Sequence, residues 1–184
     1  YYYFKSLDHD VTDETDWPDG YIRFVTPEEE YVIELANDLE SMAQTNGFDD
    51  EETVNFILRF VQSIDYKYDN YTTYAGGNDY PKYPIEMLWD ESGDCEDASN
   101  LFASLMEALD YQTVFLLVGA SMDPSEEIEG LNHAMVGVEL AEGSGQYYSD
   151  GSSSHYFLCE TTAPGPTAGY PGWEQIELFH GYYI

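Results

Sequence analysis

The sequence predicts one α+β domain, with helices in the first part of the chain and an antiparallel sheet in the second. Apolar residues recur at helical spacing in three segments between residues 26 and 109. From residue 113 the spacing changes to alternation, and the predicted strands follow one another without helices between them. The 184 residues, 43% of them hydrophobic, are enough for one domain with a core of its own.

The first expected helix begins at residue 26, after an aromatic-rich arm over residues 1–25. Thr26 can act as the N-cap, Pro27 fits the first helical position and Glu29 completes a capping box. Gly47 ends the helix. Its apolar face consists of Val32, Leu35, Ala36, Leu39, Met42 and Ala43. The arm is expected to wrap around the domain or to add an edge strand, with a turn at residues 17–20.

A second expected helix ends near residue 64, and a loop over residues 65–93 follows it. Asp49 and Glu52 form the capping pair of this helix. Its apolar positions are Val54, Ile57, Leu58, Val61 and Ile64. Residues 65–84 contain too much Tyr, Asp, Gly and Pro to continue a helix, and long loops in compact domains are often functional. The tyrosines expected to pack within this loop are Tyr66, Tyr68, Tyr71, Tyr74 and Tyr80.

The third expected helix, residues 95–109, begins with a cysteine. Asp94 is its expected N-cap, and Asp97 stands three residues later as in a capping box. Cys95 starts the buried stripe that continues through Ala98, Leu101, Phe102, Leu105 and Leu109. The segment from residue 94 to 184 is therefore expected to pair this helix with the sheet.

Four strands are expected at residues 113–118, 133–140, 156–162 and 174–184, with a flexible Gly/Ser-rich hairpin loop at 143–154. Alternation places His133 with Met135 on one face of its strand. On the next strand Glu160 points away from the side of Cys159, and adjacent antiparallel strands can bring Glu160 beside His133.

The charge of the chain is extreme. It has 37 acidic residues against five Lys and Arg, a formal net charge of −32 spread along its whole length. Such a surface repels itself at ordinary ionic strength, and molar salt screens that repulsion. We therefore interpret the chain as adapted to high salt; the alternative is an ordinary acidic protein that binds cations or basic partners. The aromatic content of 16% argues against disorder, and the scarcity of cations excludes nucleic acid as a partner.

Cys95 has the position of a nucleophile, because unpaired N–H groups and the helix dipole favour a thiolate in the first turn of a helix. Gly93 allows close approach of the backbone and of a substrate. The acidic neighbours Asp94, Glu96 and Asp97 oppose the thiolate, so a cationic partner is needed. Of the histidines His9, His133, His155 and His180, His133 is the best placed. Glu160 would then hold the imidazole in its orientation.

Four short segments resemble the transglutaminase-like superfamily: residues 83–86 (YPIE), 93–98 (GDCEDA), 132–138 (NHAMVGV) and 156–162 (YFLCETT). The resemblance extends over residues 25–165 and is strongest to archaeal and bacterial transglutaminase-like domains, which are often attached to membrane anchors. It implies a papain-like fold, in which the nucleophile helix packs on an antiparallel sheet. It also implies a triad of Cys95, His133 and Glu160. The third member is usually Asp in this family, so Glu160 departs from the pattern.

Two classes of function remain open at this stage. In the first, Cys95 attacks a peptide or amide carbonyl, and water or an amine then receives the acyl group; hydrolysis is favoured by analogy with protease-like members of the family. Its oxyanion hole would use the Cys95 N–H and a donor from residues 80–92, and the candidates for the cleft are Tyr83, Trp89 and Asp94. In the second, the fold is a catalytically silent protein-binding module. In the plainest alternative, Cys95 is only a small core residue.

We expect no cofactor and no metal. The acidic spacing matches no calcium loop, and alternation separates Cys159 from a zinc site built on Cys95 and His133. We also expect Cys95 and Cys159 to remain unbridged. No signal peptide, apolar span or initial Met is present, so the chain is interpreted as part of a longer protein. Its localisation is unknown, and an extracytoplasmic domain of an anchored, salt-adapted archaeal protein fits the resemblance. Its expected partner is a peptide or protein substrate.

Overall fold

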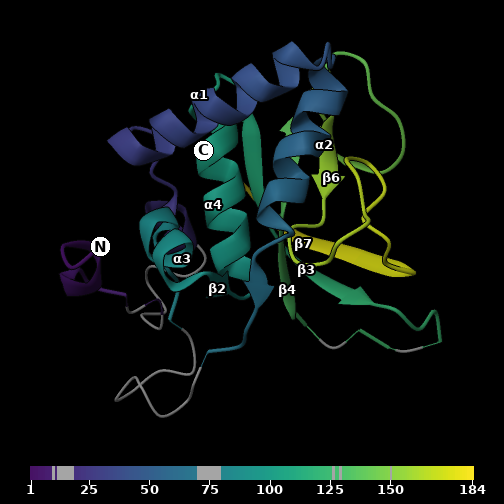
Figure 1. Cartoon of the computed structure of the whole chain (residues 1–184). Coiled ribbons are helices and arrows are strands. Elements are labelled where there is room, and N and C mark those ends of the chain that lie inside the picture. The colour runs from purple at the N-terminus through teal and green to yellow at the C-terminus, as the bar shows by residue number, and fades with distance from the viewer. Residues whose placement is uncertain (10, 12–18, 70–79, 126, 129, 150) are drawn as a thin grey trace.

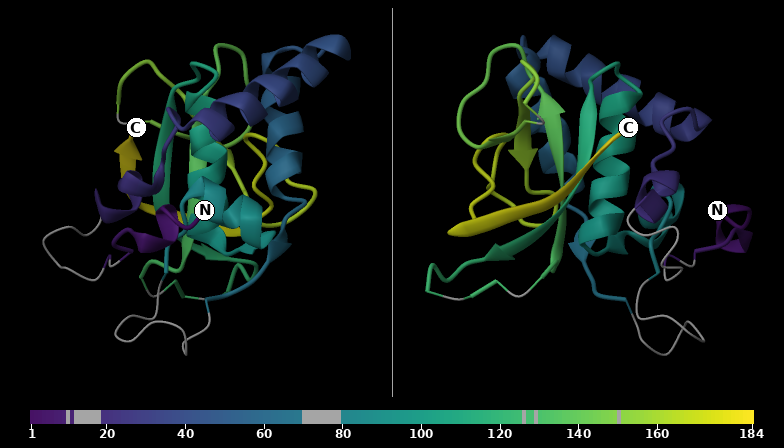
Figure 2. Two further views of the ribbon diagram at one scale, coloured as in Figure 1. Left: turned by 60° about the vertical axis from the view of Figure 1, so that its left-hand side comes forward. Right: turned by 180° about the vertical axis from the view of Figure 1, so that it is seen from behind.

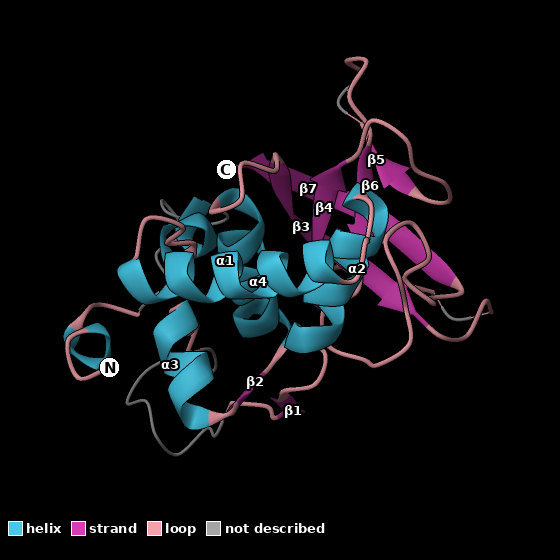
Figure 3. Cartoon of the chain, turned by 45° about the horizontal axis from the view of Figure 1, so that its top comes forward, coloured by secondary structure: helices cyan, strands magenta, loops and turns pink. Residues whose placement is uncertain are grey.

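One helix, α4, packs directly against an antiparallel sheet and organises the rest of the chain (Figure 1). The computed structural model describes residues 1–9, 11, 19–69, 80–125, 127–128, 130–149 and 151–184. Within these residues the architecture is α+β, as predicted, with four α-helices gathered on one side of a curled sheet (Figure 3). None of the helices in the described part of the chain has the length and apolar character needed to cross a membrane.

The described residues contain two short 3₁₀-helices and four α-helices. They are η1 (Phe4–Ser6), η2 (Asp19–Phe24), α1 (Glu30–Thr45), α2 (Asp50–Val61), α3 (Pro84–Asp90) and α4 (Cys95–Glu107). The strands are β1 (Asp65–Tyr66), β2 (Ser92–Gly93), β3 (Thr113–Ser121), β4 (His133–Glu139), β5 (Tyr147–Tyr148), β6 (Tyr156–Cys159) and β7 (Gln175–Tyr183).

The start of α1 differs from the prediction. Glu29 caps the helix, because its carboxylate accepts the backbone N–H groups of Tyr31 and Val32 at 2.7 and 3.3 Å. Thr26 instead donates its backbone N–H to the Ser104 hydroxyl of α4 at 2.9 Å, and this contact holds it outside the helix. Met42 was also wrongly assigned to the buried face, since it is 53% exposed. The expected core positions Val32, Ala36, Leu39 and Ala43 are buried.

The predicted capping pair of α2 is confirmed. The N–H of Glu52 donates to Asp49 at 2.9 Å, and the N–H of Asp49 donates to Glu52 at 3.1 Å. The core of this helix is as expected, with Val54, Ile57, Leu58 and Val61 buried. Together α1, α2 and α3 surround α4, which places α4 in the middle of the helical layer (Figure 1).

The segment predicted as a loop over residues 65–93 contains regular structure. The short strands β1 and β2 pair in parallel, and α3 forms with Pro84 in its first turn. The Glu86 carboxylate accepts the N–H of Tyr83 at 3.1 Å, which caps the helix. Seven residues are too few to show helical periodicity, so only the Pro84–Glu86 spacing signals this helix in the sequence. Tyr71 and Tyr74 lie outside the described residues.

The N-terminal arm wraps around the domain next to α3. His9 is 1% exposed, and its two ring nitrogens lie 2.7 Å from the carbonyl oxygen of Pro81 and 3.1 Å from that of Phe4. Val11 is also buried, in a cluster with Phe24. The described part of the arm forms 3₁₀ turns and no edge strand. Residues 17 and 18 of the expected turn lie outside the described residues.

The sheet has the strand order β5-β6-β4-β3-β7, and every neighbouring pair is antiparallel. Seen from behind, β7 forms its outer edge (Figure 2). All nine residues of β3 are buried, because α4 covers one face and the curled sheet and its loops cover the other. The expected hairpin loop 143–154 includes β5, which pairs with β6. Strand β6 ends at Cys159 rather than at residue 162.

Candidate active site

The first turn of α4 presents Cys95 at the junction between the helices and the sheet. Asp94 is the N-cap, as predicted, and its N–H donates to the Asp97 carboxylate at 3.3 Å. Gly93 precedes it in β2, and a Cβ at Gly93 would lie 2.7 Å from the Cβ of Asp97. Only glycine therefore lets β2 approach the helix this closely. Cys95 therefore lies in the first turn of the helix, next to unpaired backbone N–H groups and the positive end of the helix dipole.

Asp97 anchors this turn to the segment before α3. It is fully buried and accepts the backbone N–H of Lys82 at 2.6 Å, while the Lys82 ammonium lies 3.8 Å away. Burial raises the pKa of Asp97 well above its usual range, the Asp94 carboxylate adds to this effect, and Lys82 opposes it. Asp97 therefore holds the position of the cysteine and does not face the pocket beside it.

His133 and Glu160 form a buried pair. The His133 Nε2 lies 2.7 Å from Glu160 Oε2, and the two side chains are 8% and 2% exposed. Two further residues donate to the carboxylate: the Trp173 indole N–H at 2.6 Å and the Thr162 N–H at 2.8 Å. The glutamate is thus fixed from three directions.

Trp173 and Thr162 were missed in the sequence. Thr161, which follows Glu160 directly, shares a hydrogen bond with Ser99 of α4 at 3.2 Å. The turn of the chain after β6 decides which of the two threonines reaches the carboxylate. Trp173 is 13 residues from Glu160, and no local pattern marks that contact.

The Cys95 thiol is a second hydrogen-bonding partner of the His133 ring, beside Glu160. Nε2 is engaged with Glu160, so Nδ1 is the ring nitrogen available to the sulfur. Burial would lower the pKa of His133, but the hydrogen bonds and charges of Cys95 and Glu160 outweigh burial and raise that pKa to about 10. Burial would raise the pKa of Glu160, yet His133 and Thr162 lower it below its usual value. Both shifts favour an imidazolium held between sulfur and carboxylate.

We predict that His133 titrates near pH 10 and that Glu160→Gln moves this titration toward the ordinary value of about 6.5. Because the pKa of His133 is raised, the stability that this shift contributes is present below about pH 6.5 and is lost as the pH rises to about 10. The pKa of Glu160 is lowered, so the stability that its shift contributes is lost as the pH falls through that lowered pKa. Imidazole NMR across this pH range, with denaturant unfolding at each pH, measures both effects. A His133 titration near pH 6.5 in the unmodified chain would contradict the prediction.

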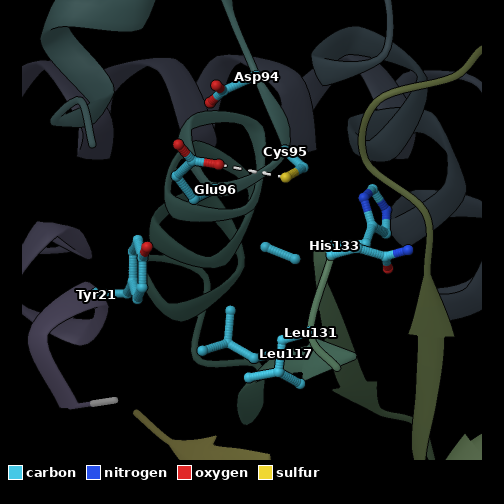
Figure 4. A pocket seen from close by; sticks show the side chains of 9 residues that line it. Tyr21, Asp94, Cys95, Glu96, Leu117, Leu131 and His133 are labelled. Atoms are coloured by element: carbon cyan, nitrogen blue, oxygen red, sulfur yellow. Dashed lines mark hydrogen bonds between the residues drawn. The ribbon is translucent and has the colours of Figure 1, made fainter. Parts of the chain in front are cut away.

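A pocket of about 250 Å³ opens beside Cys95 and His133 (Figure 4). Apolar side chains form one part of its wall, and carboxylate groups form another part. Its lining residues are Tyr21, Asp94, Cys95, Glu96, Leu117, Leu131, Asn132, His133 and Ala134. Glu96 is 7% exposed, and its carboxylate accepts the Cys95 S–H at 3.2 Å. The lining joins residues from η2, α4, β3 and the start of β4, so it depends on the β3–β4 register that pairs Leu117 with Ala134.

Of the three residues expected to line the cleft, Asp94 does so and the other two lie elsewhere. Tyr83 is 8% exposed and packs against Phe4 and Phe24, with ring centroids 5.0 and 4.8 Å apart. Trp89 is 67% exposed and stacks on Tyr1 at 5.1 Å. Both belong to the contact between the N-terminal arm and α3.

Tyr66 is a neighbour of Cys95 that the sequence analysis assigned only to loop packing. Its pairing with Gly93 in the β1–β2 bridge brings it next to the start of α4. Burial raises the pKa of Tyr66, and the nearby Cys95 raises it further. The Tyr66 hydroxyl therefore keeps its proton, and its side chain is hydrogen-bonded to Tyr68.

Both cysteines are free thiols, as predicted. Cys159 is fully buried in the core beneath the helices, and burial raises its pKa. Among the described residues, Asp69, Asp94 and Glu96 each place a carboxylate oxygen within 4.8 Å of the others. Such spacing suits a cation, although a chain with 37 acidic residues brings carboxylates close together without one.

No protein-family model matches the chain, and no curated protein matches its sequence. Solved structures with a similar backbone include a proposed cysteine protease from Cytophaga hutchinsonii, with 13% identity and a TM-score of 0.44. Another is the arylamine N-acetyltransferase from Mycobacterium abscessus, with 16% identity and a TM-score of 0.45. The alignments cover 96% and 82% of this chain, and 59% and 51% of those proteins. Any functional assignment therefore depends on the residues of the site itself.

Proposed function

We propose that the chain is a thiol enzyme that transfers acyl groups from peptides or amides, with Cys95 as nucleophile, His133 as base and Glu160 as orienting acid. The observation that supports this most directly is the buried His133–Glu160 pair at 2.7 Å beside a cysteine at a helix N-terminus. This arrangement supplies the features that activate a thiol: a cationic partner, helix N–H groups and a fixed imidazole. The papain-like, transglutaminase-like assignment is part of the same proposal.

In the proposed reaction, the proton of the Cys95 thiol is held on His133 Nδ1 as the imidazolium that the raised pKa favours, and the Cys95 thiolate attacks the substrate carbonyl carbon. The C–N bond then breaks, His133 returns the proton to the leaving amine, and an acyl thioester remains on Cys95. Water releases the acyl group as an acid, with His133 again as the base; an amine in place of water would give crosslinking. The Cys95 N–H, in the first turn of α4, is the donor that we assign to a developing oxyanion.

The alternative of a silent binding module is less well supported by the site. A core cysteine would not need a histidine with a raised pKa beside it. Cys159 of the same chain is such an inert core cysteine, since burial raises its pKa. A binding module would also have no use for three donors that fix the orientation of one buried glutamate.

The proposal predicts that iodoacetamide modifies Cys95 much faster than free cysteine at pH 7 in about 1 M salt, while Cys159 stays unmodified. Peptide mass spectrometry distinguishes the two sites, so Cys159 is an internal control in the same sample. Cys95→Ala should remove amidase activity and leave the unfolding transition nearly unchanged, because it removes one small group at the edge of the core. A Cys95 that reacts no faster than free cysteine would leave only the binding module.

A further inference from the structure

We infer that this site takes amides of apolar amino acids whose α-amino group is free, and that Glu96 binds the α-ammonium. This substrate class rests on the proposed function, since it assumes that Cys95 attacks the carbonyl. It is derived from the pocket beside the cysteine, which is lined by a buried carboxylate close to the sulfur and by apolar side chains.

The distance between Glu96 and the sulfur selects an α-ammonium. Glu96 Oε2 lies 3.2 Å from Cys95 Sγ. In the acyl-enzyme the carbonyl carbon is bonded to that sulfur, and the α-nitrogen is two bonds of about 1.5 Å further on. The α-nitrogen therefore lies in the same small volume as the carboxylate. The amine of a lysine side chain is four carbons further from the backbone, so it would extend beyond Glu96.

The charge of the pocket favours a cation in this position. No Lys or Arg is among its lining residues, whereas Asp94 and Glu96 both are, with Asp69 close to them. Because Glu96 is only 7% exposed, salt screens its attraction for an ammonium less than it screens charges on the surface. A substrate with a negative group next to the attacked carbonyl would be repelled.

The remaining wall accepts the side chain of the same residue. Tyr21, Leu117, Leu131 and Ala134 supply apolar surface below the cysteine (Figure 4). The pocket measures about 250 Å³, and an apolar cavity of about 150 Å³ already accommodates benzene. A leucine-sized or phenylalanine-sized side chain therefore fits together with the ammonium.

Binding of the ammonium would also prepare the nucleophile. In the structure the Cys95 S–H donates to Glu96, and a carboxylate so close opposes a thiolate. An ammonium that pairs with Glu96 removes this opposition and leaves the thiol proton to His133. The cysteine is then activated most when the substrate with the free amine is in place.

The test compares two alkylating reagents in about 1 M salt, leucine chloromethyl ketone and its N-acetyl derivative, which differ only at the α-amino group. The thiolate displaces chloride from each and forms one C–S bond, so modification of Cys95 can be followed by mass. We expect the free-amine reagent to react about tenfold faster or more. In Glu96→Gln, which keeps the size of the side chain and removes its charge, this preference should disappear. Glu142→Gln, an exposed acid beyond the far end of β4, is the matched control and should retain it.

Iodoacetamide, which carries no amine, separates the two levels of the proposal. It should modify Glu96→Gln at least as fast as the unmodified chain, because the variant loses the negative charge next to the sulfur. If iodoacetamide reacts rapidly but the acetylated ketone reacts as fast as the free amine, the substrate class is wrong and the thiol enzyme stands. If the preference persists in Glu96→Gln, Glu96 does not bind the amine. A Cys95 unreactive toward every reagent would overturn both.

Discussion

Replacing His133 with alanine is expected to slow the modification of Cys95 by iodoacetamide at pH 7 by about 30-fold or more. A cysteine thiol without a cationic partner is only about 3% ionised at this pH. The fall should exceed that figure, because Glu96 still accepts from the thiol at 3.2 Å and no imidazolium remains to offset it. Amide turnover should fall further, by about 10²-fold to 10⁴-fold, since His133 also returns the proton to the leaving group. Stopped-flow alkylation and a fluorogenic amide measure the two effects.

The matched control for this variant is His155→Ala. His155 is exposed and packs against Tyr147, with tilted rings whose centroids lie 4.1 Å apart, at the end of β6 away from Glu160. Its removal should leave both rates unchanged. Glu160→Gln should give an intermediate loss, because Trp173 and Thr162 still hold the side chain while the charge that stabilises the imidazolium is gone. Equal alkylation rates in His133→Ala and the unmodified chain would show that the imidazole does not activate the thiol.

Transfer of the domain from about 1 M salt to about 0.01 M salt is expected to unfold it. The Debye length grows from about 3 Å to about 30 Å over this range, so the acids of the whole surface repel one another. Two of the five cations of the chain are paired with nearby acids: Lys5 lies 3.5 Å from Glu86, and Lys82 lies 3.7 Å from Asp90. They cannot offset a net charge of −32. Loss of the near-UV circular dichroism and its return on adding salt would report the transition.

The helix starts show why we do not expect local structure to remove the repulsion between acids. Asp50, Glu51 and Glu52 occupy the first turn of α2, where the helix dipole favours negative charge. The helix dipole thus stabilises acids in the first turn of their own helix. It does not reduce the repulsion between acids on different helices and strands. Sucrose in low salt is the control, because it favours compact states without screening charge. A cooperative unfolding transition in low-salt buffer without divalent ions would contradict the high-salt interpretation.

Local signals in the sequence were sufficient for much of the framework. The Asp49–Glu52 capping pair, the start of α4 at Cys95 and the change to alternating strands are all decided within a few residues of chain, where capping and periodicity act. The same reasoning failed at Thr26, because its backbone N–H bonds to Ser104, 78 residues away. Reasoning from local signals also failed to predict α3, because this helix is too short to show helical periodicity in the sequence.

The sequence by itself determined the charge of this protein, its fold class, and the presence of a cysteine at a helix start, a histidine at the start of a later strand and a glutamate directly after the next one. Only the tertiary structure decided which groups meet: the β3–β4 register places Leu117 beside Ala134, and the turn after β6 selects Thr162 and Trp173 for Glu160. The physical reason is distance along the chain. Capping and side-chain alternation depend on neighbours, whereas the pocket and its buried pair depend on packing between elements that only the folded chain brings together.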